Sequence, residues 1–209
     1  MRRSGLRLVG ALVALLGALA ASAVADSPIK LFKEINNGPD GSTPQGFTLF
    51  NGYLYFQAND PVTGAELWRT QGDAASTTLI KDINPGPADG SPAGFTPFNG
   101  LMYFSAHTDA LGYEPWVTDG TEAGTHLLMD INPGSASSNA GGFQVLNGAV
   151  YFAAYDGVHG TELWRSDGTA AGTGLVKRMF PYGEGHPRSI ECTCKRATSH
   201  LWLPTRWVL

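Results

Sequence analysis

Carboxylates that recur at a fixed spacing are the residues of this sequence with the clearest chemical potential. A glutamate stands two residues before a tryptophan at Glu66, Glu114 and Glu162, and the intervals between these glutamates are equal. Such side chains could take part in catalysis or hold a metal ion. An active site, however, unites different residues at one place, whereas these glutamates repeat one position. The repetition therefore favours a structural task performed three times.

The residues around the glutamates form a structural motif in this interpretation. The tryptophans fill the space between repeats, the aspartates cap their own turns through backbone amides, and the glycines supply positive φ. The motif residues are Glu66, Trp68, Glu114, Trp116, Asp119, Gly120, Thr121, Glu162, Leu163, Trp164, Asp167, Gly168 and Thr169. We predict no catalytic or cofactor-binding residue. Calcium held by the aspartate-rich turns stays an alternative, although the sequence has neither the EF-hand spacing nor the Gly-Gly-x-Gly-x-Asp nonapeptide.

Residues that do not repeat are better candidates for a unique site. His107 and His159 both fall in the loop expected between the second and third strands of a repeat. No Ser-His-Asp order and no His-Glu-x-x-His spacing connects the histidines. We therefore expect ordinary loop residues at the non-repeating positions, which are Lys81, His107, Tyr113, His126, His159 and Lys177.

The elements that position these residues belong to a repeat of about 48 residues, a length in the range of known repeat units. Several independent markers keep this period without an insertion, which makes chance agreement negligible. The markers are Trp68, Trp116 and Trp164, then Phe47, Phe95 and Phe143, then Asn51-Gly52, Asn99-Gly100 and Asn147-Gly148. They divide residues 26–177 into three repeats, at about 34–81, 82–129 and 130–177.

One repeat contains the signals of four short strands. In the middle repeat these are Gly94–Phe98, Leu101–Ala106, a segment around Glu114–Val117, and His126–Met129. Asn99-Gly100 separates the first two apolar runs, and this pair is the signal of a type I′ hairpin turn. Four antiparallel strands in about 40–50 residues are typical of a β-propeller blade. A stacked β-solenoid is the alternative architecture.

The sequence therefore predicts an all-β fold of three four-stranded antiparallel blades in a β-propeller-like array. Propellers close with roughly four to eight blades, so three blades form a partial propeller. Each terminal blade would leave an apolar sheet face uncovered. We expect self-association through these faces, or a fragment of a larger propeller.

Residues 178–209 break the pattern. The phenylalanine expected at position 191 is Glu191, and the expected Asn-Gly is Lys195-Arg196. Such an abrupt change favours a frameshift or a mispredicted gene end, with a disordered or poorly packed tail. A zinc site of His186, Cys192, Cys194 and His200 is the competing interpretation, although a Cys-x-Cys pair is unusual for zinc.

The N-terminus has the order of a secretory signal peptide. Arg2, Arg3 and Arg7 precede the apolar run 8–20, and Ala23-Val24-Ala25 gives an A-x-A cleavage site. The apolar run is shorter than the ~20 residues of a membrane-spanning helix. We expect cleavage near Ala25, a secreted or cell-surface protein, and no membrane span.

The charge of the repeats restricts the partners. Residues 26–177 carry 16 acidic and 6 basic residues, a net charge of −10, which would repel nucleic acid. These residues include no cysteine, so a disulfide framework is excluded. An extracellular protein or glycan remains the expected kind of partner.

The third repeat resembles a known family. Glu162-Leu163-Trp164-Arg165-Ser166-Asp167-Gly168-Thr169, followed by Gly172-Thr173, is similar to the signature of the bacterial ELWxxDGT repeat proteins, some of which are described as hyalin-like. The resemblance covers about residues 29–177. The second repeat has Pro115 in place of leucine, and the first has Gln71-Gly72-Asp73 where Asp-Gly-Thr is expected, which suggests a degenerate first blade. The resemblance implies a secreted, propeller-like protein.

Together these observations predict a secreted bacterial repeat protein with a non-catalytic binding or scaffold role. The alternative is a truncated extracellular enzyme, a glycan hydrolase or lyase, whose active site lies in missing blades. A non-functional truncated gene product is the third possibility.

Resequencing the gene tests the frameshift. Translation of every frame past the Lys177 codon should show Glu-Leu-Trp and Asp-Gly-Thr units resuming at the spacing of the three repeats. If no frame continues the repeat, the tail is authentic, and His186, Cys192, Cys194 and His200 become the residues to test.

Overall fold

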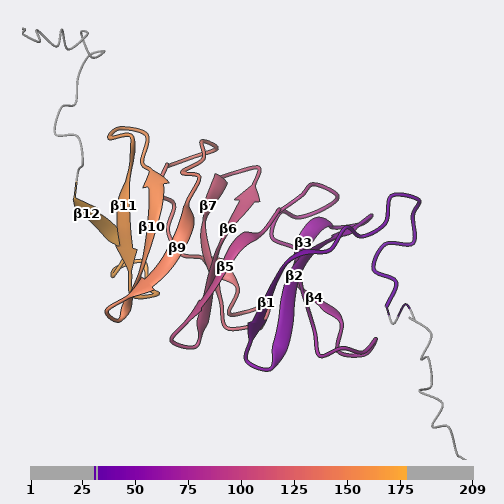
Figure 1. The fold of residues 1–209 in the computed structure, drawn as a ribbon. Helices are drawn as coiled ribbons and strands as arrows, with labels where there is room; N and C mark the ends of the chain where they lie inside the picture. The colour runs from indigo at the N-terminus through magenta and orange to yellow at the C-terminus, as the bar shows by residue number, and fades with distance from the viewer. Residues whose placement is uncertain (1–30, 32, 178–209) are drawn as a thin grey trace, which may run out of the picture. The chain divides into compact units, whose positions relative to one another are not determined.

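The structure, a computed structural model, is all-β and describes residue 31 and residues 33–177. The signal-peptide and tail predictions fall outside these residues. Three four-stranded antiparallel sheets follow one another along the chain, each in simple sequence order (Figure 1). Sheet 1 comprises β1 (Gln45–Phe50), β2 (Tyr53–Asp60), β3 (Gly64–Thr70) and β4 (Thr78–Lys81); sheet 2 comprises β5 (Ala93–Phe98), β6 (Leu101–Thr108), β7 (Gly112–Thr118) and β8 (His126–Leu127); sheet 3 comprises β9 (Gly141–Leu146), β10 (Ala149–Tyr155), β11 (Thr161–Ser166) and β12 (Gly174–Lys177).

The predicted fold class is confirmed, because each repeat forms one separate four-stranded meander as a propeller blade does. The described sheets are blade-like and do not close into a ring. Among the described residues we find no helix with the length and apolarity needed to cross a membrane.

The Asn-Gly pairs form the predicted hairpin turns. Asn99 and Gly100 have φ values of 49° and 77°, and the other two pairs repeat these values closely. Phe98 pairs directly with Leu101, so the loop has two residues. Positive φ at both loop residues defines the type I′ turn.

The fourth strand of sheet 2 is shorter than expected. We predicted His126–Met129, whereas β8 contains only His126–Leu127. In sheet 1 the corresponding ladder extends to the pair of Leu67 and Lys81. Sheet 2 has Pro115 at the position of Leu67, and proline has no N–H to continue the ladder.

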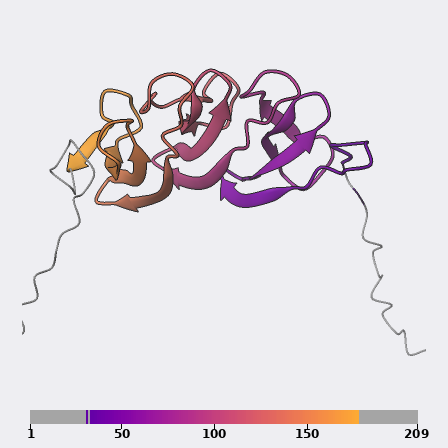
Figure 2. The ribbon, with the colours of Figure 1, turned by 90° about the horizontal axis from the view of Figure 1, so that it is seen from above.

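Neighbouring sheets lie face to face (Figures 1 and 2). Apolar clusters of side chains join them. We call the face toward the following sheet the trailing face and the opposite one the leading face. Tyr55, Leu67 and Ile80 of the trailing face of sheet 1 share a cluster with Phe104 and Trp116 of sheet 2. An equivalent cluster joins sheets 2 and 3. The core of this fold thus lies between the sheets.

We call the contact region between two neighbouring sheets a junction. Two close contacts of glycine residues recur at both junctions. A Cβ placed on Gly46 would lie 3.1 Å from the ring of Phe95 in the next sheet, and one on Gly94 would lie 3.6 Å from Phe143. The turn glycine Gly120 likewise lies against the hydroxyl of Tyr55 in the preceding sheet. Glycine is required there for space as well as for a φ of 98°.

Substituting this turn glycine should cost more stability inside a junction than outside one. Gly120→Ala introduces both positive-φ strain and a clash with Tyr55. Gly72→Ala is the matched control, because Gly72 has the same register, a φ of 100° and no described atom within 4 Å of its Cβ position. We expect Gly120→Ala to lower the free energy of unfolding by about 1–3 kcal/mol more than the control. Urea denaturation of the monomeric chain measures both variants, and equal losses would contradict the fit.

Candidate functional site

The first repeated glutamate is fully buried in β3 and accepts hydrogen bonds from the backbone. Glu66 Oε2 accepts the N–H of Ile83 at 3.0 Å, and Oε1 accepts those of Asn84 at 3.3 Å and Gly90 at 2.7 Å. These donors lie in the segment 82–92 that connects sheet 1 to sheet 2. The carboxylate therefore fixes the connection between two sheets.

The second repeated glutamate makes the same contacts one repeat later. Glu114, also fully buried, accepts the N–H of Ile131 at 2.9 Å and that of Ser138 at 2.8 Å. The sequence separation between glutamate and donor is the same in both sheets, 17 for the first donor and 24 for the last. Glu162 is buried in β11 at the same register, and the positions equivalent to these donors lie outside the described residues. The carboxyl groups of Glu66 and Glu114 therefore serve as hydrogen-bond acceptors for the backbone of the fold itself.

Burial changes the protonation of these carboxyl groups. Burial raises the pKa of Glu66 to about 7 from the usual 4.5, although the N–H donors of Ile83, Asn84 and Gly90 act in the opposite direction. Burial also raises the pKa of Glu114, against hydrogen bonds from Ser138 and Ile131. The dry environment thus favours the neutral form of both side chains.

The tryptophans lie on the leading faces of their sheets. Trp116 belongs to the cluster between sheets 1 and 2, and Trp164 to the cluster between sheets 2 and 3. Trp68 packs with Phe56 and with Ile35, which lies in the segment before β1. The tryptophans of sheets 2 and 3 thus pack between neighbouring sheets.

The Asp-Gly-Thr segments are self-contained turns. Asp119 Oδ1 accepts the N–H and the hydroxyl of Thr121 at 2.8 and 2.7 Å, and Thr121 Oγ1 accepts the N–H of Gly124. Asp167 and Thr169 repeat these contacts. The hydroxyl of the threonine contributes most to lowering the pKa of each aspartate. Asp73 in the first repeat instead accepts the N–H groups of Ala75 and Ser76, so this turn differs chemically.

The non-repeating residues do not converge. Of the six, His159 lies in a loop as expected, whereas the expectation was wrong for the others, which lie in strands; His107 belongs to β6 and pairs with Tyr113 of β7. The rings of His107 and Tyr113 lie 5.0 Å apart, and His159 Nδ1 lies 2.6 Å from Asp156 Oδ2. Lys81 Nζ donates to the carbonyl oxygen of Glu122, at 3.4 Å. Within residues 33–177, no three His, Cys, Asp or Glu side chains gather as a metal site would require. His126 contacts the carbonyl of Gly124, and Lys177 is exposed in β12.

One repeated contact escaped the sequence interpretation. Buried hydroxyl pairs close each turn between the third and fourth strands, with a constant separation in the sequence. They are Thr70 with Thr77, Thr118 with Thr125, and Ser166 with Thr173, at 2.7–2.8 Å. The sequence signal for these pairs is the constant spacing between their two hydroxyl residues, which is the same in all three repeats.

Comparison with known proteins adds little to this all-β repeat architecture. No protein-family model and no curated protein matches the chain. Among solved structures, the chain is similar to the computationally designed Ika8 protein, with 12% identity and a TM-score of 0.38. The alignment covers 68% of this chain and 37% of the designed one. At this TM-score the similarity carries no argument about family or function.

The buried carboxyl groups predict a dependence of stability on pH. The folded chain titrates Glu66 near 7 and the unfolded chain near 4.5, so the folded state holds the additional proton between these values. The free energy of unfolding should therefore fall as the pH rises from 4.5 through 7, by roughly 2–3 kcal/mol for Glu66. Urea titrations at pH 4.5, 6 and 8 measure this loss.

Glu66→Gln is the control for that titration. The glutamine does not ionise, so the free energy of unfolding should fall less as the pH rises. Its NH2 group cannot accept a backbone N–H, which should lower stability at pH 4.5 by about 1–3 kcal/mol. An unchanged pH dependence would contradict the role of Glu66.

Proposed function

We propose that this chain is a secreted bacterial repeat protein with a non-catalytic binding or scaffold role at the cell surface or outside the cell. Export is supported by the signal-peptide order that ends at Ala23-Val24-Ala25. The bacterial origin and the surface role are supported by the resemblance of residues 29–177 to ELWxxDGT repeats. The non-catalytic role is supported by the contacts of Glu66 and Glu114, whose carboxylates accept backbone donors inside the fold.

The observation that carries the proposal is the shape of the hairpin tips between the second and third strands of sheets 1 and 3. Val62 and Val158 stand at the same register and are 71% and 75% exposed. Each valine donates its N–H to an aspartate two residues earlier, to Asp60 Oδ1 at 2.7 Å and to Asp156 Oδ1 at 3.0 Å. These bonds hold an apolar side chain in water on a fixed turn.

Fixed loop tips are suited to recognition. Loops positioned by a rigid scaffold commonly carry binding residues, and a turn that is already ordered loses little conformational entropy on binding. The tip of sheet 3 is fixed further by the contact between Asp156 and His159. Burial raises the pKa of Asp156, but the hydrogen bonds from His159 and Val158 outweigh it and lower the pKa to about 2. We assign an extracellular protein or glycan as the ligand of these tips.

Binding to washed cells of the source bacterium tests the proposal. The fluorescently labelled secreted chain should bind these cells, and Val62→Asp combined with Val158→Asp should weaken binding about tenfold, a loss of ~1.4 kcal/mol. Leu49→Asp is the matched control, because Leu49 is 75% exposed on β1 rather than on a tip. Protease and glycosidase treatment of the cells distinguishes a protein from a glycan ligand. Absence of binding, or equal binding by the tip variant, would refute the proposal.

A further inference from the structure

The trailing face of sheet 3 exposes side chains that sheets 1 and 2 bury at the same register. Val176 is 46% exposed, whereas its counterparts Ile80 and Leu128 are 6% and 3% exposed. Leu163 is 41% exposed, and its counterpart Leu67 is inaccessible. The third strand reflects this difference, because β3 and β7 are buried almost throughout while β11 alternates between exposed and buried residues. The trailing face of sheet 3 comprises Leu146, Tyr151, Leu163, Arg165 and Val176.

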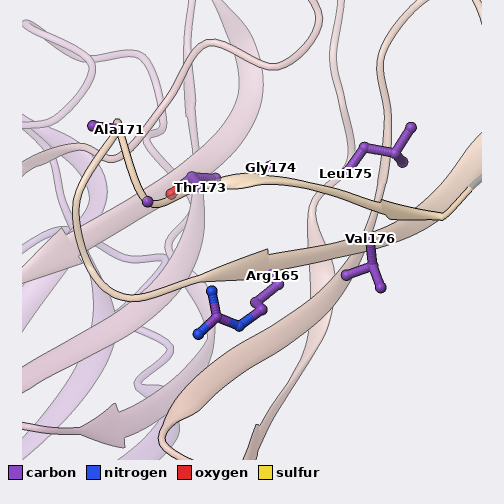
Figure 3. Close-up of a pocket in the computed structure, with 7 residues that line it drawn as sticks. Arg165, Ala171, Thr173, Gly174, Leu175 and Val176 are labelled. Atoms are coloured by element: carbon purple, nitrogen blue, oxygen red, sulfur yellow. The ribbon is translucent and has the colours of Figure 1, made fainter.

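A charged group on this face also has a defined counterpart. In sheet 1, Arg69 stacks over Tyr53 and donates from Nη1 to the carbonyl of Gly120 in the following sheet, at 2.7 Å. Arg165 has the same register in sheet 3 and is exposed. Arg165 and Val176 line a pocket of about 260 Å³, and Figure 3 shows their side chains on the same side of the β11–β12 hairpin. The trailing face of sheet 3 therefore exposes the guanidinium group of Arg165 at the position where Arg69 of sheet 1 binds the turn of sheet 2.

The leading face of sheet 1 carries the complementary halves of the same contacts. Each junction places a phenylalanine on a glycine of the preceding sheet, which leaves Phe47 and Gly142 unmatched within the described residues. Phe47 is 57% exposed, and no described atom lies within 4 Å of a Cβ on Gly142. Each junction also places a turn glycine against a tyrosine, which leaves Gly72 and Tyr151 unmatched in the same way.

The leading face of sheet 1 already includes its connecting segment. Ile35 packs beside Trp68 as Ile83 packs in the cluster with Trp116. Ser42 accepts the N–H of Asn59 at 2.8 Å, which matches the bond from His107 to Gly90. The leading face of sheet 1 is therefore built like the leading face of sheet 2, which packs on sheet 1.

We propose that copies of this chain associate head to tail, with the leading face of sheet 1 of one copy on the trailing face of sheet 3 of another. Phe47 then lies on Gly142 of the neighbouring copy, and Arg165 reaches the carbonyl of its Gly72. A second copy fits better than residues 178–209 of the same chain, since their register puts Glu191 where the junction needs a phenylalanine. Two copies joined at both ends would make six sheets, within the range of roughly four to eight blades in propellers.

Sedimentation velocity of the secreted chain, with two variants, tests the contact. Phe47→Asp blocks the leading face, and Leu146→Asp with Val176→Asp blocks the trailing face. The unmodified chain should sediment as a dimer or larger, and each variant alone as a monomer. Ala110→Asp is the matched control, because Ala110 is exposed at the hairpin tip of sheet 2, and it should associate as the unmodified chain does. Near-ultraviolet circular dichroism checks that every variant is folded.

Mixing the two variants distinguishes head-to-tail contact from any symmetric one. The Phe47→Asp chain keeps an intact trailing face, and the other variant keeps an intact leading face, so a 1:1 mixture should form a heterodimer through one contact. A monomeric unmodified chain would overturn the proposal and point to residues 178–209 as the cover of the face. Variants that still associate alone, or a mixture that remains monomeric, would also overturn it.

Discussion

The fold depends on a buried carboxylate that accepts backbone hydrogen bonds from the segment linking one sheet to the next. Glu66 binds the N–H groups of Ile83, Asn84 and Gly90, and Glu114 repeats the arrangement. A linking segment inside a junction has few backbone partners of its own, and unpaired N–H groups there would be costly. The glutamate supplies these partners and so holds the linking segment beside the apolar clusters that join neighbouring sheets.

This arrangement shows why the repeat read from sequence is not an independent unit. The donors for Glu66 come from residues of the next repeat, and Trp116 shares a cluster with Leu67 and Ile80 of the previous one. Neighbouring repeats thus share both their core and their polar contacts. Stability in such an array is a sum of terms for each repeat and each junction.

Much of the fold was predictable because its signals are local. Asn99-Gly100 specifies a type I′ turn through its own backbone, and the spacing of the tryptophans specifies the repeat. The truncation of β8 was also foreseeable in principle, since Pro115 lacks an N–H, but its effect appears only once its ladder partner is known. The partners of Glu66 could not be predicted, because a contact with a donor as distant in sequence as Gly90 depends on how the linking segment crosses the junction. The exposed tips at Val62 and Val158 could not be predicted, because a lone valine in a loop has no distinguishing pattern.

The span of the glutamate contacts also explains where this kind of sequence can change in length. Between Glu66 and Gly90 the chain must return to a fixed carboxylate, so an added residue would pull a donor away from its acceptor. The hairpin tips at 60–63 and 156–160 are closed only by local contacts to Asp60 and Asp156, and loop tips of this kind tolerate insertions. Descendants of this repeat would therefore diversify by lengthening their tips while the remainder of the period stays constant.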